Sequence, residues 1–342
     1  MDDLEILKVS IAQVLAQDCD PRSLHDYVNQ RGGDLAAALG RQAGELGWLG
    51  IGLGEEAGGL GMGIQGAALL ARELGRRLAP GPFAAVLASI EVIERFAPEE
   101  ISKQVLPGLV SGELGAAIPA SFEAGEFGGW LLGEIESAVL LLHGETGLAL
   151  AKAREPVDQH GAWDRTRGLW QKPADPEVLC MLPEAAAGHL ERVASLLVAA
   201  DTLGAMEGLF DITVDFLKQR EQFGVAIGSF QALKHRMADM AAQIELADCL
   251  LEQALGADDA DVVFWSGMCK AEVTDMVAQL AGDCLQLHGA IGFTWEHDCH
   301  LYLKRVRLNQ ALVWSNHALR QGSFDALVAA SVNGRSLMEI GQ

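Results

Sequence analysis

The residues best suited to contact a charged nucleotide lie around Arg220. Arg220 follows a run of apolar residues at steps of three and four, so the sequence predicts it at the exit of a long helix. A guanidinium fork suits a pyrophosphate, which point charges bind less selectively. Phe223 follows closely and offers a flat surface to an aromatic ring. The alternative interpretation is that Arg220 is a surface helix end and Phe223 a core anchor.

A second candidate segment runs from Gln286 to Gly292. Glycines at Gly289 and Gly292 let the backbone approach a ligand closely, because they carry no Cβ. The Gln286 amide can donate and accept hydrogen bonds. The spacing therefore predicts a turn whose backbone and Gln286 amide could contact a ligand.

Metal and nucleophile signals are weaker. The segment 297–300 reads His-Asp-Cys-His, whose side chains could bind a metal, but no second cluster in the sequence completes four ligands. We therefore predict no metal and interpret the segment as a solvated helix start. The chain also lacks a nucleophile elbow, a dinucleotide fingerprint and a P-loop.

The composition bounds the class of protein. The chain has 342 residues, half of them hydrophobic, which suits two or three packed subdomains. Its net charge of -22 would repel nucleic acid and anionic membranes, and no apolar run reaches membrane-spanning length. The six cysteines have no framework spacing, which favours free thiols in a reducing compartment. With no signal peptide at the acidic start, the sequence predicts a soluble cytoplasmic protein.

Three zones position the candidate residues. Residues 1–112 show helical spacing interrupted by a Gly-rich loop at 50–63, and residues 186–342 show longer helical stripes. Between them, residues 113–185 carry short apolar runs typical of strands. These runs are Gly115–Ile118, Ala138–Leu142, Thr146–Ala151 and Val178–Leu182.

Each zone predicts a domain. A barrel of about eight strands needs roughly 80 residues, slightly more than the middle zone has, so we expect a reduced central β-barrel. The stripes 203–217 and 230–255 predict long helices packed nearly antiparallel, as in a four-helix bundle, with a turn at 256–261. The predicted fold is mainly α with a central β-barrel.

Several separated motifs resemble the acyl-CoA dehydrogenase family. They are Arg220-x-x-Phe223-Gly224, then Phe230-Gln231, the turn from Gln286 to Thr294, and, near the start, 45–50, 55–61 and 72–80. Members of this family oxidise the α,β carbons of an acyl-CoA thioester with FAD. The resemblance implies that this chain contacts the FAD of a neighbouring subunit through Arg220, Phe223, Gln231, Gln286, Gly289 and Ala290.

The catalytic base that the resemblance implies is missing. The reaction needs a carboxylate over the carbon beside the thioester carbonyl. Most members of the family carry a Glu where this chain has Val313, and others carry it where this chain has Ala194. Glu191 is the remaining candidate, although a Glu beside Arg192 early in a helix is usually helix-end electrostatics.

The family's own flavin-cradling strand is also degenerate here. The segment from Ile118 to Gly125 keeps little beyond Pro119, and no Trp stands in the family's local pattern. The resemblance thus implies a subunit that contributes FAD contacts in trans to a second, catalytic subunit in an α2β2 assembly. Such assemblies act on CoA thioesters of steroid side chains and pass electrons to a separate acceptor.

Two alternatives stay open at this point. The chain could be a self-sufficient homotetrameric dehydrogenase that uses Glu191 as its base. It could instead be a flavin-free scaffold that retains its helices only to bind a protein.

Overall fold

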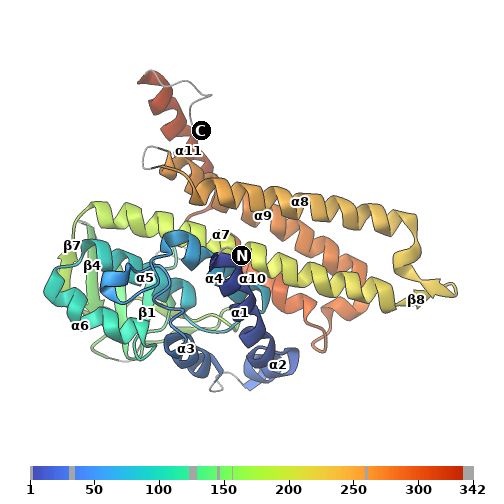
Figure 1. Cartoon of the computed structure of the whole chain (residues 1–342), viewed down its shortest axis with the longest axis horizontal. Coiled ribbons are helices and arrows are strands. Elements are labelled where there is room, and N and C mark those ends of the chain that lie inside the picture. Colours follow the sequence, from blue (N-terminus) through green and yellow to red (C-terminus); the bar gives the residue numbers. More distant parts are fainter. Residues whose placement is uncertain are drawn as a thin grey trace.

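The structure is a computed structural model that describes residues 3–30, 35–122, 129–144, 147–155, 157–258 and 261–333. Helices occupy the N-terminal part, a mixed sheet follows, and long helices run across the molecule toward the end labelled β8 (Figure 1). The predicted boundary at 112/113 lies between a helix and the first strand, and that at 185/186 lies in the first turn of a long helix. We retain both as proposed domain boundaries.

The N-terminal region contains six α-helices and the short 3-10 helix η1, Glu55–Ala57, within the predicted Gly-rich loop. The apolar spacing read from the sequence buries one face of α4 and most of α5. The helices are α1 (Asp3–Asp18), α2 (Pro21–Gln30), α3 (Leu35–Glu45), α4 (Gly63–Arg76), α5 (Phe83–Phe96) and α6 (Glu99–Val110).

The described strands form an open sheet, so the expected closed barrel is wrong. Seven strands lie in the order β5-β6-β2-β1-β3-β4-β7, with β5 and β7 at its edges. Closure would require these edge strands to meet, and β5 has only two residues. The strands are β1 (Gly115–Pro119), β2 (Trp130–Gly133), β3 (Ala138–Gly144), β4 (Gly147–Lys152), β5 (Gln159–His160), β6 (Leu169–Gln171) and β7 (Glu177–Leu182).

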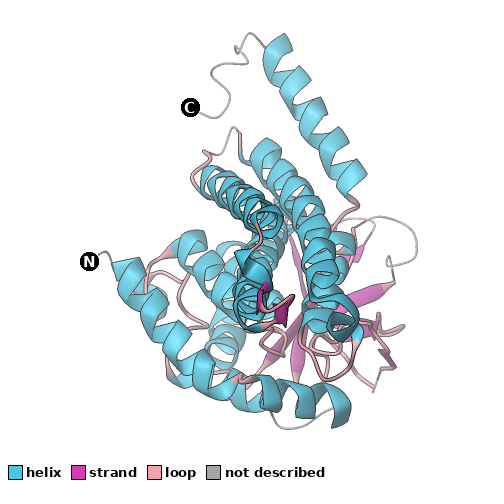
Figure 2. Ribbon diagram, turned by 90° about the vertical axis from the view of Figure 1, so that its right-hand side faces the viewer, coloured by secondary structure: helices cyan, strands magenta, loops and turns pink. Residues whose placement is uncertain are grey.

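The C-terminal region is built on long helices, as predicted. Figures 1 and 2 show α7, α8 and α9 side by side, with a small two-stranded hairpin, β8–β9, at one end and α11 projecting from the body. The elements are α7 (Ala185–Gln219), β8 (Glu221–Gln222), β9 (Val225–Ala226), η2 (Ile227–Ser229), α8 (Gln231–Leu255), α9 (Val262–His288), η3 (Gly289–Phe293), α10 (Cys299–Ala311) and α11 (Asn316–Val332).

Helix α7 is the central core element. Among the described helices it alone is long and apolar enough to cross a membrane, but 89% of its apolar window is buried inside the protein. Two glycines permit its close contact with α4: a Cβ on Gly204 would lie 1.8 Å from the Arg72 carbonyl oxygen, and one on Gly75 would lie 2.1 Å from that of Asp201. Any side chain at either position would force the two helices apart.

A buried ion cluster joins the sheet region to the C-terminal helices. Arg305 on α10 donates from Nε to Asp164 Oδ2 at 2.6 Å and from Nη1 to Asp201 Oδ1 at 2.9 Å. Arg167 also pairs with Asp201, at 2.7 Å. Burial raises the pKa of Asp164, but the charge of Arg305 and hydrogen bonds from Thr166 outweigh it and hold that pKa below its usual range. The cluster fixes where α10 sits relative to the sheet.

Candidate functional site

The Arg-x-x-Phe-Gly segment folds into a tight hairpin at the end of α7. Arg220 caps the helix, with its backbone N–H donating to the Phe216 carbonyl at 2.8 Å, and its side chain is exposed. Phe223 and Gly224 have φ values of 55° and 79°, as a two-residue turn between twisted strands requires. Phe223 is consequently 94% exposed, so it is not the core anchor of the alternative interpretation.

The Gly-rich turn follows the end of α9. Gly289 has a φ of 65° and caps the helix, and Ala290 lies in η3. The side chains of Gln286 and Ala290 are exposed, as Gly289 is. The sequence-predicted turn is therefore present and presents both backbone and the Gln286 amide to a ligand or partner.

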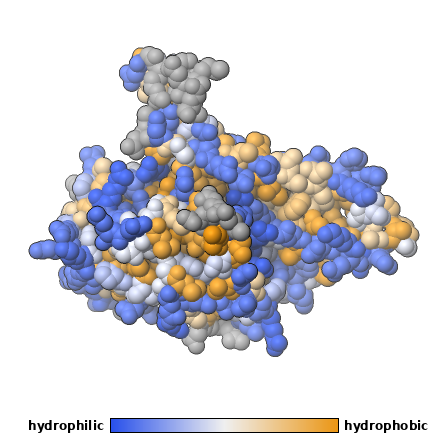
Figure 3. Space-filling view, in the orientation of Figure 1, coloured by the Kyte–Doolittle hydropathy of each residue, from blue (hydrophilic) through white to orange (hydrophobic). Residues whose placement is uncertain are grey.

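The six predicted contact residues lie at one end of the C-terminal helices. Phe216, one turn before Arg220, stacks on His288 at the end of α9 with ring centroids 4.5 Å apart. Arg236 near the start of α8 donates to Asp283 on α9 at 2.6 Å, which brings Gln231 to the same end. Hydrophobic residues gather at this tip in Figure 3, where Figure 1 labels β8. The surface is exposed and aromatic rather than enclosed.

The two positions where the family carries a base are both buried in this chain. Val313 and Ala194 are each 1% exposed, and neither side chain can accept a proton. Val313 forms a parallel bridge to Ser121: its N–H donates to the Ala120 carbonyl at 2.8 Å, and its carbonyl accepts from the Phe122 N–H at 2.8 Å. The chain just after β1 is thus tied by backbone hydrogen bonds to the position of the missing base.

Aromatic side chains occupy the space beside this bridge. Phe122 stacks on Trp314 with ring centroids 6.3 Å apart and an angle of 12° between the ring planes. His143 on β3 meets the edge of Phe122 at 5.9 Å. The described space beside Val313 is thus filled by the chain's own aromatic side chains, whereas the candidate residues at the helix ends are exposed.

Comparisons with known proteins identify the family of this chain. The family description "Acyl-CoA dehydrogenase, N-terminal domain" matches residues 1–113, and "Acyl-CoA dehydrogenase, C-terminal domain" matches residues 189–313. Acyl-CoA dehydrogenase IpdE2 of Mycobacterium tuberculosis is 30% identical over 322 residues, covering 92% of this chain and 94% of the relative. The chain belongs to the acyl-CoA dehydrogenase family.

Solved structures of the acyl-CoA dehydrogenase fold superpose over nearly the whole chain. The Tcur3481-Tcur3483 steroid ACAD has a TM-score of 0.84 at 23% identity, covering 97% of this chain and 99% of that one. The ChsE4-ChsE5 complex from Mycobacterium tuberculosis has a TM-score of 0.77 at 22% identity, covering 98% of both chains. At these identities the likeness establishes the fold.

Glu191 remains the carboxylate of interest for acyl-CoA dehydrogenase chemistry in this chain. It lies in the second turn of α7 and lines a cavity of about 250 Å³ together with Trp314 and Ser266. Burial raises its pKa. Glu191 thus lies near Val313, because the neighbouring Trp314 lines the same cavity.

Sequence reasoning missed the group that fixes this region. Lys270 on α9 is fully buried, and its ammonium donates to the carbonyls of Gln310 and Trp314 at 2.9 and 2.8 Å. It also donates to Asn316 Oδ1 at 2.9 Å. These contacts hold the turn 310–316 that contains Val313. The only sequence signal for this structural role is a single Lys among apolar residues. That signal does not predict which groups accept its hydrogen bonds.

Proposed function

We propose that this chain is a non-catalytic subunit of a heteromeric, FAD-dependent acyl-CoA dehydrogenase. In this proposal it contributes FAD contacts to a site whose base and flavin cradle belong to a different, catalytic subunit. The assembly desaturates the α,β bond of an acyl-CoA and passes electrons to a separate acceptor. The similarity to IpdE2 and to a steroid ACAD favours a CoA thioester from steroid degradation.

The observation that carries the proposal is the contrast between the two halves of a flavin site. Arg220 and Phe223 are exposed at the helix ends, with Gln231, Gln286 and the turn at Gly289 beside them. A guanidinium fork suits the pyrophosphate, and Phe223 offers a ring face to an aromatic group. At Val313, by contrast, the chain carries no carboxylate where the family has its base, and the backbone pairs with the segment after β1. Bound FAD would supply the hydride acceptor of the reaction.

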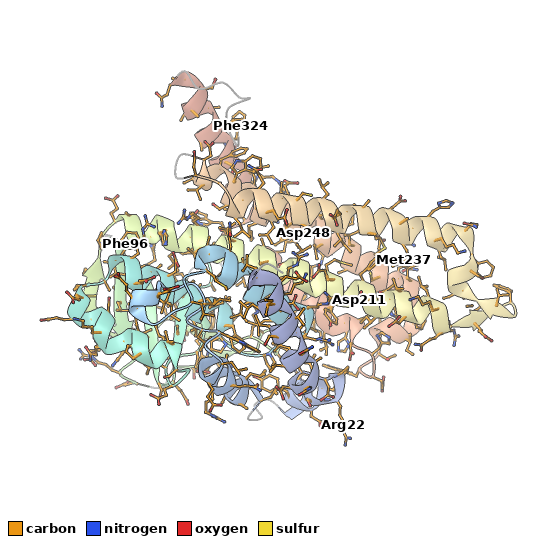
Figure 4. All side chains as sticks on the ribbon, in the orientation of Figure 1. Arg22, Phe96, Asp211, Met237, Asp248 and Phe324 are labelled. Atoms are coloured by element: carbon orange, nitrogen blue, oxygen red, sulfur yellow. The ribbon has the colours of Figure 1, made fainter. Side chains whose placement is uncertain are left out.

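Exposed apolar surface supports an assembly with another subunit. Phe324 on the projecting helix α11 is 57% exposed, and Val332 at its end is 80% exposed (Figure 4 labels Phe324). Leu246 on the outer side of α8 is 57% exposed. A heterotetramer that pairs through these helices would cover them. We also propose that the assembly is cytoplasmic.

The test is cofactor retention in the complex with its catalytic partner. Arg220→Ala should weaken FAD binding by roughly 10- to 150-fold, because a charge-assisted bond contributes about 1.5–3 kcal/mol. Arg220→Lys should recover only part of this loss, since an ammonium cannot bind in bidentate fashion. Arg154→Ala is the matched control, because Arg154 is an exposed arginine in the sheet region. Equal FAD affinity in all four proteins would remove Arg220 from the proposed site.

The self-sufficient alternative rests on Glu191, whose pKa is raised by burial as that of a general base often is. The scaffold alternative rests on the exposed apolar helices alone. The turnover rate of a Glu191→Gln complex distinguishes the self-sufficient alternative from the main proposal. The flavin content of the complex distinguishes the scaffold alternative.

A further inference from the structure

Four histidines and a buried cysteine gather where α2, the end of α9 and the start of α10 meet. His288 and His297 lie with ring centroids 4.5 Å apart, and His25 and His300 lie 6.4 Å apart. Cys299 is fully buried, with its Sγ 3.2 Å from His288 Nδ1. The cluster stands apart from Val313 and is not used by the proposed dehydrogenase chemistry.

Three of these side chains converge on one point. A ligand atom from each of His288, His297 and Cys299 lies within 4.8 Å of the other two. Tetrahedral Zn²⁺ with Zn–S and Zn–N bonds of about 2.3 and 2.0–2.1 Å separates its ligand atoms by roughly 3.3–3.6 Å. The three ligand atoms lie within 4.8 Å of one another, so side-chain rotations that bring them closer by at most about 1.5 Å would let them coordinate an ion.

A polar atom left without a partner supports a ligand at this place. His288 is 4% exposed, and its Nε2 has no hydrogen-bond partner among the described residues. Its Nδ1 lies 2.9 Å from the Cys284 carbonyl oxygen, the kind of outer contact that fixes the ring of a metal-bound histidine. His297 would exchange one weak contact, the 3.2 Å hydrogen bond that its Nδ1 accepts from the Cys299 N–H, for the ion.

A cavity of about 250 Å³ reaches the cluster at His297. It is lined by His297, His25, Glu296 and Asp298, and by Arg22, which Figure 4 labels on α2. Three protein ligands leave the fourth position of a tetrahedral ion for a water from this cavity. From the sequence, only the segment 297–300 was a candidate, without further ligands. In the fold, His288 at the end of α9 provides an additional ligand.

We propose that His288, His297 and Cys299 form a binding site for a divalent ion that prefers thiolate and imidazole ligands, Zn²⁺ first. Binding would release the Cys299 thiol proton, so affinity should rise with pH. The ion would join the last residue of α9 to the start of α10 and so fix both ends of the turn 289–294. That this turn contacts FAD rests on the proposed function, but the metal site does not.

The experiment is a titration of chelator-treated full-length protein with Co²⁺, followed by displacement with Zn²⁺. We expect one Co²⁺ per chain, with the near-ultraviolet charge-transfer absorption of a cobalt–thiolate bond, and its loss when Zn²⁺ is added. His297→Ala and Cys299→Ser should each weaken Co²⁺ binding by more than about 10–100-fold, the usual cost of losing even an outer contact. His297 is only half-buried, so its variant is expected to fold.

The matched controls are His235→Ala and Cys249→Ser, which remove an exposed histidine and an exposed cysteine on α8. Both should retain the absorption and the affinity of the parent. Absence of charge-transfer absorption in the parent would overturn the site. So would equal affinity in the parent and in His297→Ala. Neither readout involves FAD or activity, so a failure here leaves the proposed function standing, and the reverse also holds.

Discussion

At the scale of single residues, the sequence predicts which chemical groups Arg220 and Val313 carry. It does not predict which residues lie next to them in the fold. The sequence placed Arg220 at a helix exit, and the structure confirms that it caps α7. It could not reveal that Val313 has a φ of 70° and bridges Ser121, because both depend on a pairing between segments nearly 200 residues apart. The three residues of the proposed metal site lie within 12 positions of one another, but only the fold shows that their side chains converge.

Restoring a carboxylate at position 313 should not restore catalysis. Val313→Glu puts an acid where most of the family has its base, but the backbone bridge and the Phe122–Trp314 stack occupy the adjacent space. General-base catalysis needs substrate within hydrogen-bonding reach. The buried acid should instead lower the free energy of unfolding by ~1–3 kcal/mol.

Denaturant unfolding and dye reduction with acyl-CoA measure the two outcomes. Val313→Gln is the matched control, because it has the same size without an ionisable group. Dye reduction by the Glu variant in the absence of a partner would show that this chain retains its own flavin site.

Glu191 decides between the proposed function and the self-sufficient alternative. Its carboxyl is half-buried beside Trp314 with a raised pKa, so loss of its charge should have only a small effect on folding. If the base belongs to the partner, the Glu191→Gln complex should turn over acyl-CoA as fast as the parent complex. A turnover rate lowered by about 100-fold or more, typical for a lost general base, would favour the alternative.

At the scale of elements, local periodicity predicted several helices and strands well. The run Ala138–Leu142 lies within β3, and Val178–Leu182 lies within β7, because alternation and bounding Gly and Pro residues are local signals. The predicted start of the third run, Thr146, is outside the described residues. The barrel was wrong because closure depends on whether β5 and β7 meet, which no local pattern encodes.

The buried ion cluster makes stability depend on pH. The pKa of Asp164 is lowered in the folded state, so its contribution is present above its unfolded pKa of about 3.9 and is lost as the pH falls through the folded value. Asp164→Asn should cost ~3–5 kcal/mol at pH 7, because Arg305 loses a buried partner. The difference between variant and parent should shrink as the pH falls below about 4.

Urea unfolding at a series of pH values measures this dependence. Asp175→Asn is the control, since Asp175 forms an exposed pair with Arg154 and should change stability by less than about 1 kcal/mol. A constant difference between Asp164→Asn and the parent down to pH 3 would show that folding does not lower the pKa of Asp164.

At the scale of the whole molecule, the helix ends and the region around Val313 differ in whether they are open to a ligand. The helix ends present an exposed arginine, an aromatic ring and a glycine turn, while the space around Val313 is closed by the chain itself. Family motifs spread along the sequence were enough to predict the acyl-CoA dehydrogenase fold, and the family matches confirm it. Neither surface predicts the identity of the proposed partner, because that identity depends on complementary residues in another chain.

The flavin content of the purified chain, alone and with its partner, tests the central claim most directly. The single chain is saturated with FAD and passed through a desalting column, and its bound flavin is measured by absorbance. The complex obtained by co-expression with a dehydrogenase-like chain encoded beside it is treated in the same way. We expect almost no flavin on the single chain, and about one FAD for each pair of unlike chains in the complex. Stoichiometric FAD on the single chain would contradict the account.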